Sequence, residues 1–150
     1  MTQLGIEQVL SELGASIGAD LKPDANGVVT LAIGDDVALS IEVPADSDFV
    51  YFHGSVKRLG GSDRVAALED AMERNLFGLS MSGAWLALDR SSGELLLCYS
   101  SLAAGVDADK LLGTLEALAA TVRALRQEES GQRGDDNTQS LSVTDHFIRV

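Results

Sequence analysis

The chain has 150 residues, a length that fits one domain with enough chain to bury a real core. Its 23 acidic and 11 basic residues give a formal net charge of −12. Nucleic acid is therefore not expected as a partner, because neutralising phosphates needs a basic face. An acidic surface keeps a protein soluble and can also attract a basic partner, and charge alone does not choose between these roles.

The first predicted element is a short amphipathic helix, which fades at Gly14 or Gly18. Its apolar residues recur at helical spacing: Ile6, Val9, Leu10, Leu13 and Ile17. Leu4 lies off this stripe, nearly opposite Leu13. It is either an ordinary exposed leucine or a contact for a partner, and the sequence leaves both interpretations open.

Three strands are expected next. The first two span Val28 to Ile33 and Val37 to Val43, and alternation in the second gives it one core face and one face open to water or a partner. The two adjacent aspartates between them form a hairpin turn rather than a cation site, because no further oxygen ligands follow at a calcium-loop spacing. The third strand, Phe49 to Val56, carries large apolar groups on both faces, so both should be covered, at least in a complex.

The central helix runs from about Val65 to Leu76, and Ser62 and Asp63 can cap its free N–H groups. Its apolar residues fill nearly half of its circumference: Val65, Ala67, Leu68, Ala71, Met72 and Leu76. So wide an arc predicts two buried contacts, one with the protein's own sheet and one with a second subunit. Asn75 falls within the arc and should need a specific hydrogen-bond partner.

Two strands follow, Ala84 to Asp89 and Glu94 to Tyr99, closed by a tight turn that ends in glycine. The final amphipathic helix should cover the sheet with a narrow apolar stripe of Leu111, Leu115, Leu118, Val122 and Leu125. Composition then shifts to charge, Gly, Ser and Asn, which predicts a domain over residues 1–126 and a flexible tail over residues 127–150. The last ten residues become apolar again and would add a strand, dock on a surface or stay loose.

The element order predicts an α+β fold. Strands that follow one another through short turns favour a mostly antiparallel, twisted sheet packed by helices, in the order α-β-β-β-α-β-β-α. No apolar segment is long enough to span a bilayer, so membrane insertion is not expected. The N-terminus lacks a basic region followed by an apolar run, so no secretory signal is expected either.

One stretch resembles a known family. The run from Asn75 through Gly83-Ala84-Trp85-Leu86-Ala87-Leu88-Asp89 to Ser92-Gly93-Glu94-Leu95 is similar to the core signature of the class I type III secretion chaperones, the Tir chaperone (CesT) family. The order and length of the elements extend this resemblance over roughly Leu4 to Leu125. No residue in the signature is catalytic, so it is a signature of fold more than of activity.

The resemblance implies a function. It implies a homodimeric chaperone in the bacterial cytoplasm, which holds the N-terminal segment of a secreted effector in extended form without a cofactor or ATP. Physically, this is sheet-edge pairing with apolar side chains entering surface grooves. Carried over by element, the expected partner-binding residues are Leu4, Leu10, Val29, Leu31, Ile33, Leu39 and Ile41. The expected dimer interface comprises Leu68, Met72, Leu76 and Trp85.

Two other classes of function stay open. One is a regulatory or scaffolding module of the same fold, and the other is an enzyme or small-ligand domain. We expect no catalytic residue, because Cys98, the only cysteine, lies in an apolar strand, and His53 and His146 lack any nucleophile-base motif. A structural zinc site normally needs about four cysteine or histidine ligands. The chain has only these three such residues, far apart in the sequence, so no structural zinc is expected. Trp85 and Tyr51 could stack on a ligand, but core packing is preferred.

Overall fold

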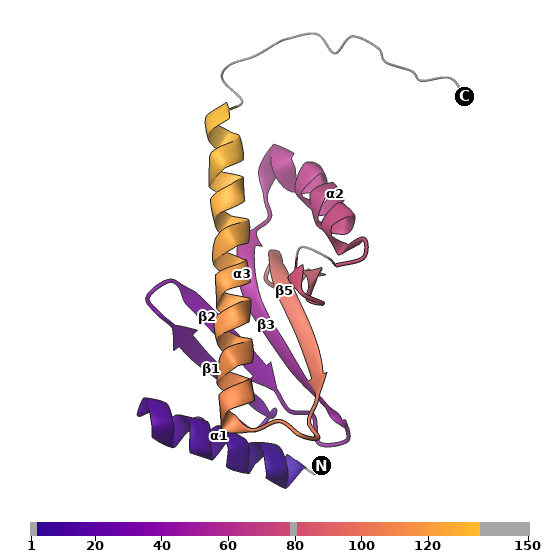
Figure 1. Cartoon of the computed structure of the whole chain (residues 1–150). Coiled ribbons are helices and arrows are strands. Elements are labelled where there is room, and N and C mark those ends of the chain that lie inside the picture. Colours follow the sequence, from indigo (N-terminus) through magenta and orange to yellow (C-terminus); the bar gives the residue numbers. More distant parts are fainter. Residues whose placement is uncertain (1–2, 79–80, 136–150) are drawn as a thin grey trace, which may run out of the picture.

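The computed structural model describes residues 3–78 and 81–135 (Figure 1). Its elements are α1 (Gln3–Ile17), β1 (Val28–Ile33), β2 (Val37–Glu42), β3 (Phe49–Arg58), the short 3-10 turn η1 (Gly61–Asp63), α2 (Arg64–Asn75), β4 (Trp85–Asp89), β5 (Glu94–Leu102) and α3 (Ala108–Asp135). This order confirms the predicted α+β fold.

The five strands form one antiparallel sheet in the order β1-β2-β3-β5-β4. The long strands β3 and β5 lie side by side at its centre, with Phe52 opposite Tyr99, and β3 carries a bulge between Ser55 and Lys57. The chain leaves β3 through α2 before it returns as β4, which then pairs only with β5. The strands at the two edges of the sheet are therefore β1 and β4.

The hydrophobic core lies between one face of the sheet and the helices α1 and α3. Figure 1 shows α3 running along the sheet, with α1 crossing near the N-terminal end of α3. Leu10 of α1, Ile41 of β2 and Leu115 of α3 are fully buried at this contact. Gly54 of β3 lets the layers approach, because a Cβ there would lie 2.6 Å from Leu39 Cδ2.

Two arginines of α3 fasten the helix to strand ends. Arg123 donates from Nε to both carboxylate oxygens of Asp36, at 3.0 and 2.9 Å, and from Nη2 to the Ile33 carbonyl oxygen at 2.6 Å. Arg126 donates to the carbonyl oxygens of Ser55 and Val56, at 2.7 and 3.1 Å. Asp36 thus lies in a hairpin turn and is bound by Arg123. The sequence predicted a hairpin turn here in preference to a cation site.

The helix α3 is longer than the sequence predicts. It continues to Asp135, so the expectation that a tail begins at residue 127 is wrong for residues 127–135. Polar contacts hold this end: Glu128 accepts from Arg74 Nη1 of α2 at 2.7 Å, and Glu129 pairs with Lys57 of β3. The apolar stripe stops at Leu125, which is why apolar periodicity alone missed the extension. Residues 136–150, including His146, lie outside the described residues.

Candidate partner-binding surfaces

The outer edge of β1 offers main-chain groups to a partner. The Gly27 carbonyl oxygen accepts from Val43 N at 2.9 Å, toward β2. The main-chain groups of the next residue, Val28, point the other way and bond to Asp24. Because the direction of the main-chain N–H and C=O groups alternates along a strand, those of Thr30 and Ala32 also point outward, away from β2. Both are exposed, and within the described residues no hydrogen bond occupies their N–H or C=O groups.

Asp24 closes one end of this edge, and the hairpin turn that contains Asp36 ends the other. Asp24 Oδ1 accepts from the N–H of Val28 at 3.0 Å and of Asn26 at 2.8 Å, while Asp24 N donates to the Val28 carbonyl oxygen at 2.9 Å. At the hairpin end, Asp36 is held by Arg123, whose hydrogen bonds keep the pKa of that carboxyl below its usual value. The open part of the edge therefore spans Thr30 to Ala32.

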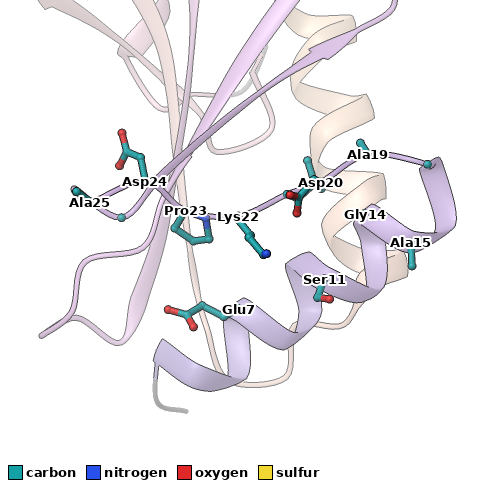
Figure 2. A pocket seen from close by; sticks show the side chains of 13 residues that line it. Glu7, Ser11, Gly14, Ala15, Ala19, Asp20, Lys22, Pro23, Asp24 and Ala25 are labelled. Carbon is teal, nitrogen blue, oxygen red and sulfur yellow. The ribbon is translucent and has the colours of Figure 1, made fainter.

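An open pocket of about 770 Å³ lies beside the Asp24 end of this edge, between α1 and residues 18–27 (Figure 2). Glu7 and Ser11 project into it from α1, and Lys22 extends toward them from the facing segment. Glycines and alanines line much of the rest of its wall, together with Asp20, Leu21, Pro23 and Asp24. Gly14 lets the chain that follows α1 turn back close to the helix, because a Cβ there would lie 2.4 Å from the Ala19 carbonyl oxygen.

Negative charge gathers around this edge and pocket. Over residues 5–56, Lys22 is the only lysine or arginine. The acidic residues of the same span are Glu7, Glu12, Asp20, Asp24, Asp35, Asp36, Glu42, Asp46 and Asp48. At the hairpin end, Arg123 and Arg126 of α3 offset this charge by bonding to Asp36. At the pocket, Glu7, Asp20 and Asp24 face a single cation, Lys22, and this excess of negative charge favours a basic segment there.

At the opposite edge, on β4, a side chain occupies the outward groups of Leu86. Asn75, the last residue of α2, donates from Nδ2 to the Leu86 carbonyl oxygen at 2.9 Å and accepts from Leu86 N at 2.7 Å. The Asn75 side chain thereby makes the pair of hydrogen bonds that a residue of a neighbouring strand would make with Leu86. The prediction that Asn75 needs a specific partner is confirmed. This edge is thus occupied at Leu86, and the next outward residue, Leu88, is partly buried, whereas both outward residues of β1, Thr30 and Ala32, are exposed.

A second candidate surface lies on α2. We define the α2 surface as Val65, Met72, Leu76 and Phe77, which are 65%, 75%, 65% and 82% exposed. The other apolar side of the helix, with Ala67 and Ala71, is buried. Phe77 has a φ of 66°, a left-handed conformation that costs a non-glycine residue about 1 to 2 kcal/mol. The wide apolar arc thus has one face on the protein's own core and one face free.

The sheet face that points away from α1 and α3 also carries apolar side chains. Phe49 and Tyr51 are 41% and 37% exposed, with ring centroids 6.3 Å apart, and they alternate with the buried Val50 and Phe52. Further along β3 on this face, His53 Nε2 lies 2.9 Å from Glu42 Oε1. One face of β3 is therefore covered by the protein itself, and the expectation that a complex covers the other stays a prediction.

Most of the predicted partner-binding residues lie in the core. Four are at most 4% exposed: Leu10, Val29, Leu39 and Ile41. The prediction is wrong for these four as surface contacts, because burying the strongest apolar positions of each element contributes most to folding. Leu31 and Ile33 are partly buried at the open edge and remain available. The side chain of Leu4 lies outside the described residues.

The predicted dimer residues divide differently. Met72 and Leu76 belong to the exposed α2 surface, and Trp85 is 38% exposed on the edge strand β4. Leu68 is partly buried against the core instead. Their contact with a second subunit stays a prediction.

Sequence reasoning missed Asp24, Thr30, Ala32 and Phe77. Asp24 carried a usable signal, since an aspartate two residues before Asn26-Gly27 is typical of a side-chain-bonded turn. The small and polar residues of the edge carried none, because their role depends on main-chain direction.

Catalytic chemistry gains little support from the geometry. Cys98 is half-buried, and its burial, with a smaller effect of the Glu42 charge, raises the pKa of its thiol. Such a thiol stays protonated and unreactive at neutral pH. Within residues 3–78 and 81–135, no group of three or more His, Cys, Asp or Glu side chains is placed to hold a metal ion, and no helix is long and apolar enough to cross a membrane.

A family model matches residues 8–126 of the chain, and its description is Tir chaperone protein (CesT) family. The chain belongs to this family. The family assignment predicted from the signature around Trp85 is confirmed, and the family is a class of chaperones. A comparison with curated protein sequences finds no match.

Solved structures share the fold at low identity. The HopA1–SchA chaperone–effector complex matches with 19% identity and a TM-score of 0.67, over 83% of this chain and 95% of that one. The ExsC–ExsE complex matches with 18% identity and a TM-score of 0.73, over 85% of this chain and 96% of that one. The ExoT–SpcS complex from Pseudomonas aeruginosa matches with 21% identity and a TM-score of 0.60, over 81% of this chain and 97% of that one. These likenesses confirm the predicted fold. Membership of the Tir chaperone family supports the expected function, an effector-binding chaperone of type III secretion.

Proposed function

We propose that this chain is a chaperone of a type III secretion system, which binds the N-terminal segment of a secreted effector in extended form and keeps it competent for export. Family membership supports the class of function. The observation that carries the mechanism is the open edge of β1, where the main-chain groups of Thr30 and Ala32 face outward. An effector strand pairing there would extend the sheet without needing a fixed sequence.

Side chains beside the edge would supply selectivity. Leu31 and Ile33 lie between the outward-facing residues and pack partly against the core. Apolar effector residues spaced two apart would cover their exposed parts, while the acidic surroundings would attract basic residues. Since ordering a long segment costs conformational entropy, affinity must come from a large contact area beyond this short edge.

The proposed assembly is a homodimer. The α2 surface, with Met72, Leu76 and Phe77, is the apolar region that a second copy would cover, and an isologous contact would bury the same residues on both subunits. The dimer would present two β1 edges to one effector. We further propose that the protein works in the bacterial cytoplasm, without a cofactor and without catalysis.

Replacing Ala32 by proline tests the edge mechanism. Proline lacks the N–H that the edge offers, and an edge strand tolerates it where that N–H faces solvent. The variant Ala32→Val keeps the N–H and serves as the matched control. In a host that carries a secretion system, affinity capture with mass spectrometry should recover a secreted protein with the native chain and with Ala32→Val, and much less of it with Ala32→Pro.

Three outcomes would contradict the proposal. Equal capture by Ala32→Pro and Ala32→Val would exclude edge pairing at β1. Recovery of a partner that is never exported would favour a regulatory or scaffolding module. Turnover of the captured protein would point to an enzyme.

A further inference from the structure

We propose that Asp24 acts as an edge stop: it limits strand addition on β1 to Thr30 and Ala32 and turns the partner chain out of the sheet at Val28. The inference rests on the proposed function and specifies the partner segment that this edge accepts.

The stop follows from the hydrogen bonds at Val28. Its N–H already donates to Asp24 Oδ1 at 3.0 Å, and its carbonyl oxygen already accepts from Asp24 N at 2.9 Å. Asp24 therefore occupies the position that a paired partner residue would take. A strand that grows from Ala32 through Thr30 meets this occupied rung and has to leave the plane of the sheet.

The other end of the edge is restricted too. The strand ends at Ile33, whose main-chain groups face β2, and the hairpin turn follows it. The open edge therefore offers two outward residues, Thr30 and Ala32, each able to exchange one pair of hydrogen bonds with an antiparallel partner. The paired stretch is therefore short, because the partner residue beyond the one opposite Thr30 would meet the position that Asp24 occupies.

Pairing at this edge dictates the partner's sequence pattern. Residues directly opposite each other share a sheet face, so the partner residues beside Leu31 and Ile33 lie on the helix side and should be apolar. Those beside Thr30 and Ala32 lie on the open face and can be small or polar. Where the partner chain leaves the sheet, it passes the Asp24 carboxylate and the pocket that holds Glu7 (Figure 2), so a lysine or arginine suits this position.

The test uses a synthetic probe, the peptide Lys-Val-Thr-Val-Thr-Val-Lys with uncharged ends, and the full chain labelled with ¹⁵N. Amide hydrogen exchange is measured by NMR with and without the peptide. The peptide should slow exchange at Thr30 and Ala32 at least tenfold and leave Val28 unchanged. The same peptide with Glu in place of both Lys residues should bind several-fold more weakly.

Two variants isolate the stop. Asp24→Asn keeps the acceptor oxygen, so Val28 should behave as in the native chain. Asp24→Ala removes it and frees the Val28 N–H, while the main-chain N–H of residue 24 stays on the Val28 carbonyl oxygen. The Val28 amide should therefore exchange fast in the free protein and become protected when the peptide binds. If Asp24→Ala does not fold, the exchange rates of Val28, Thr30 and Ala32 in the native chain, with and without the peptide, still test the edge stop.

The outcomes separate this inference from the function. Peptide protection at Val28 together with Thr30 and Ala32 in the native chain overturns the stop, while edge pairing survives. An unchanged pattern in a folded Asp24→Ala variant also overturns it. No protection anywhere on β1 overturns the stop and edge pairing together, yet capture of a secreted effector by the native chain would still support the chaperone function.

Discussion

At the C-terminal end of α2, the Asn75 side chain satisfies both main-chain groups of Leu86. Replacing Asn75 by alanine would leave a donor and an acceptor without partners at a partly buried site. We expect the free energy of unfolding to fall by about 1 to 3 kcal/mol. Chemical denaturation measures this loss, with Glu73→Ala on the exposed side of the same helix as the control. A loss no greater than that of the control would mean that water replaces the amide.

Asp89 has a defined pH dependence. Hydrogen bonds from the Ser91 and Ser92 side chains and from Ser91 N lower the pKa of its carboxyl to about 2, from an ordinary 3.8. Because the folded-state pKa is depressed, the stability that Asp89 contributes is complete above 3.8 and is lost as the pH falls toward 2. An NMR titration of the folded protein should place the Asp89 midpoint near 2, and a midpoint near 3.8 would contradict these contacts. The variant Ser92→Ala should raise that midpoint.

At the scale of elements, the order of the α-helices and strands could be predicted, because the helices have apolar residues at helical spacing and the strands are apolar runs bounded by turns. Hydrophobic patterning also predicted the two-sided character of α2. It failed where polar contacts decide the outcome: Glu128 and Glu129 extend α3 beyond its apolar stripe, and Asp24 and Asn75 close strand edges by hydrogen bonds. The partner residues were misplaced for a related reason. Apolar periodicity finds the core face of a strand, whereas an open edge is defined by main-chain direction.

The end of α3 gives a test at this scale. A chain that stops after Arg126 loses both Glu128, which pairs with Arg74, and Glu129, which pairs with Lys57. Each pair is partly exposed and contributes on the order of 1 kcal/mol or less. The thermal midpoint should therefore lie a few degrees below that of a chain that stops after Asp135. Equal midpoints would mean that these pairs add nothing, and high salt should narrow the difference.

For the whole molecule, the exposed α2 surface predicts a dimer. Sedimentation at micromolar concentration should give twice the mass of the chain, and Met72→Glu should give a folded monomer. The monomer should stay folded because Met72 is 75% exposed in the single chain, so the new charge is buried only at the subunit contact. Glu116→Gln, which removes an exposed charge on α3 instead, should remain dimeric. A native chain that sediments as a monomer would contradict the assembly.

The central claim is that a partner segment joins the sheet at β1, and hydrogen exchange on the complex with the captured effector tests it most directly. The account predicts new protection at the amides of Thr30 and Ala32 and along an extended stretch of the effector, with Leu86 at the β4 edge unchanged. Protection confined to a compact effector domain, with Thr30 and Ala32 still exchanging as in the free chain, would contradict it.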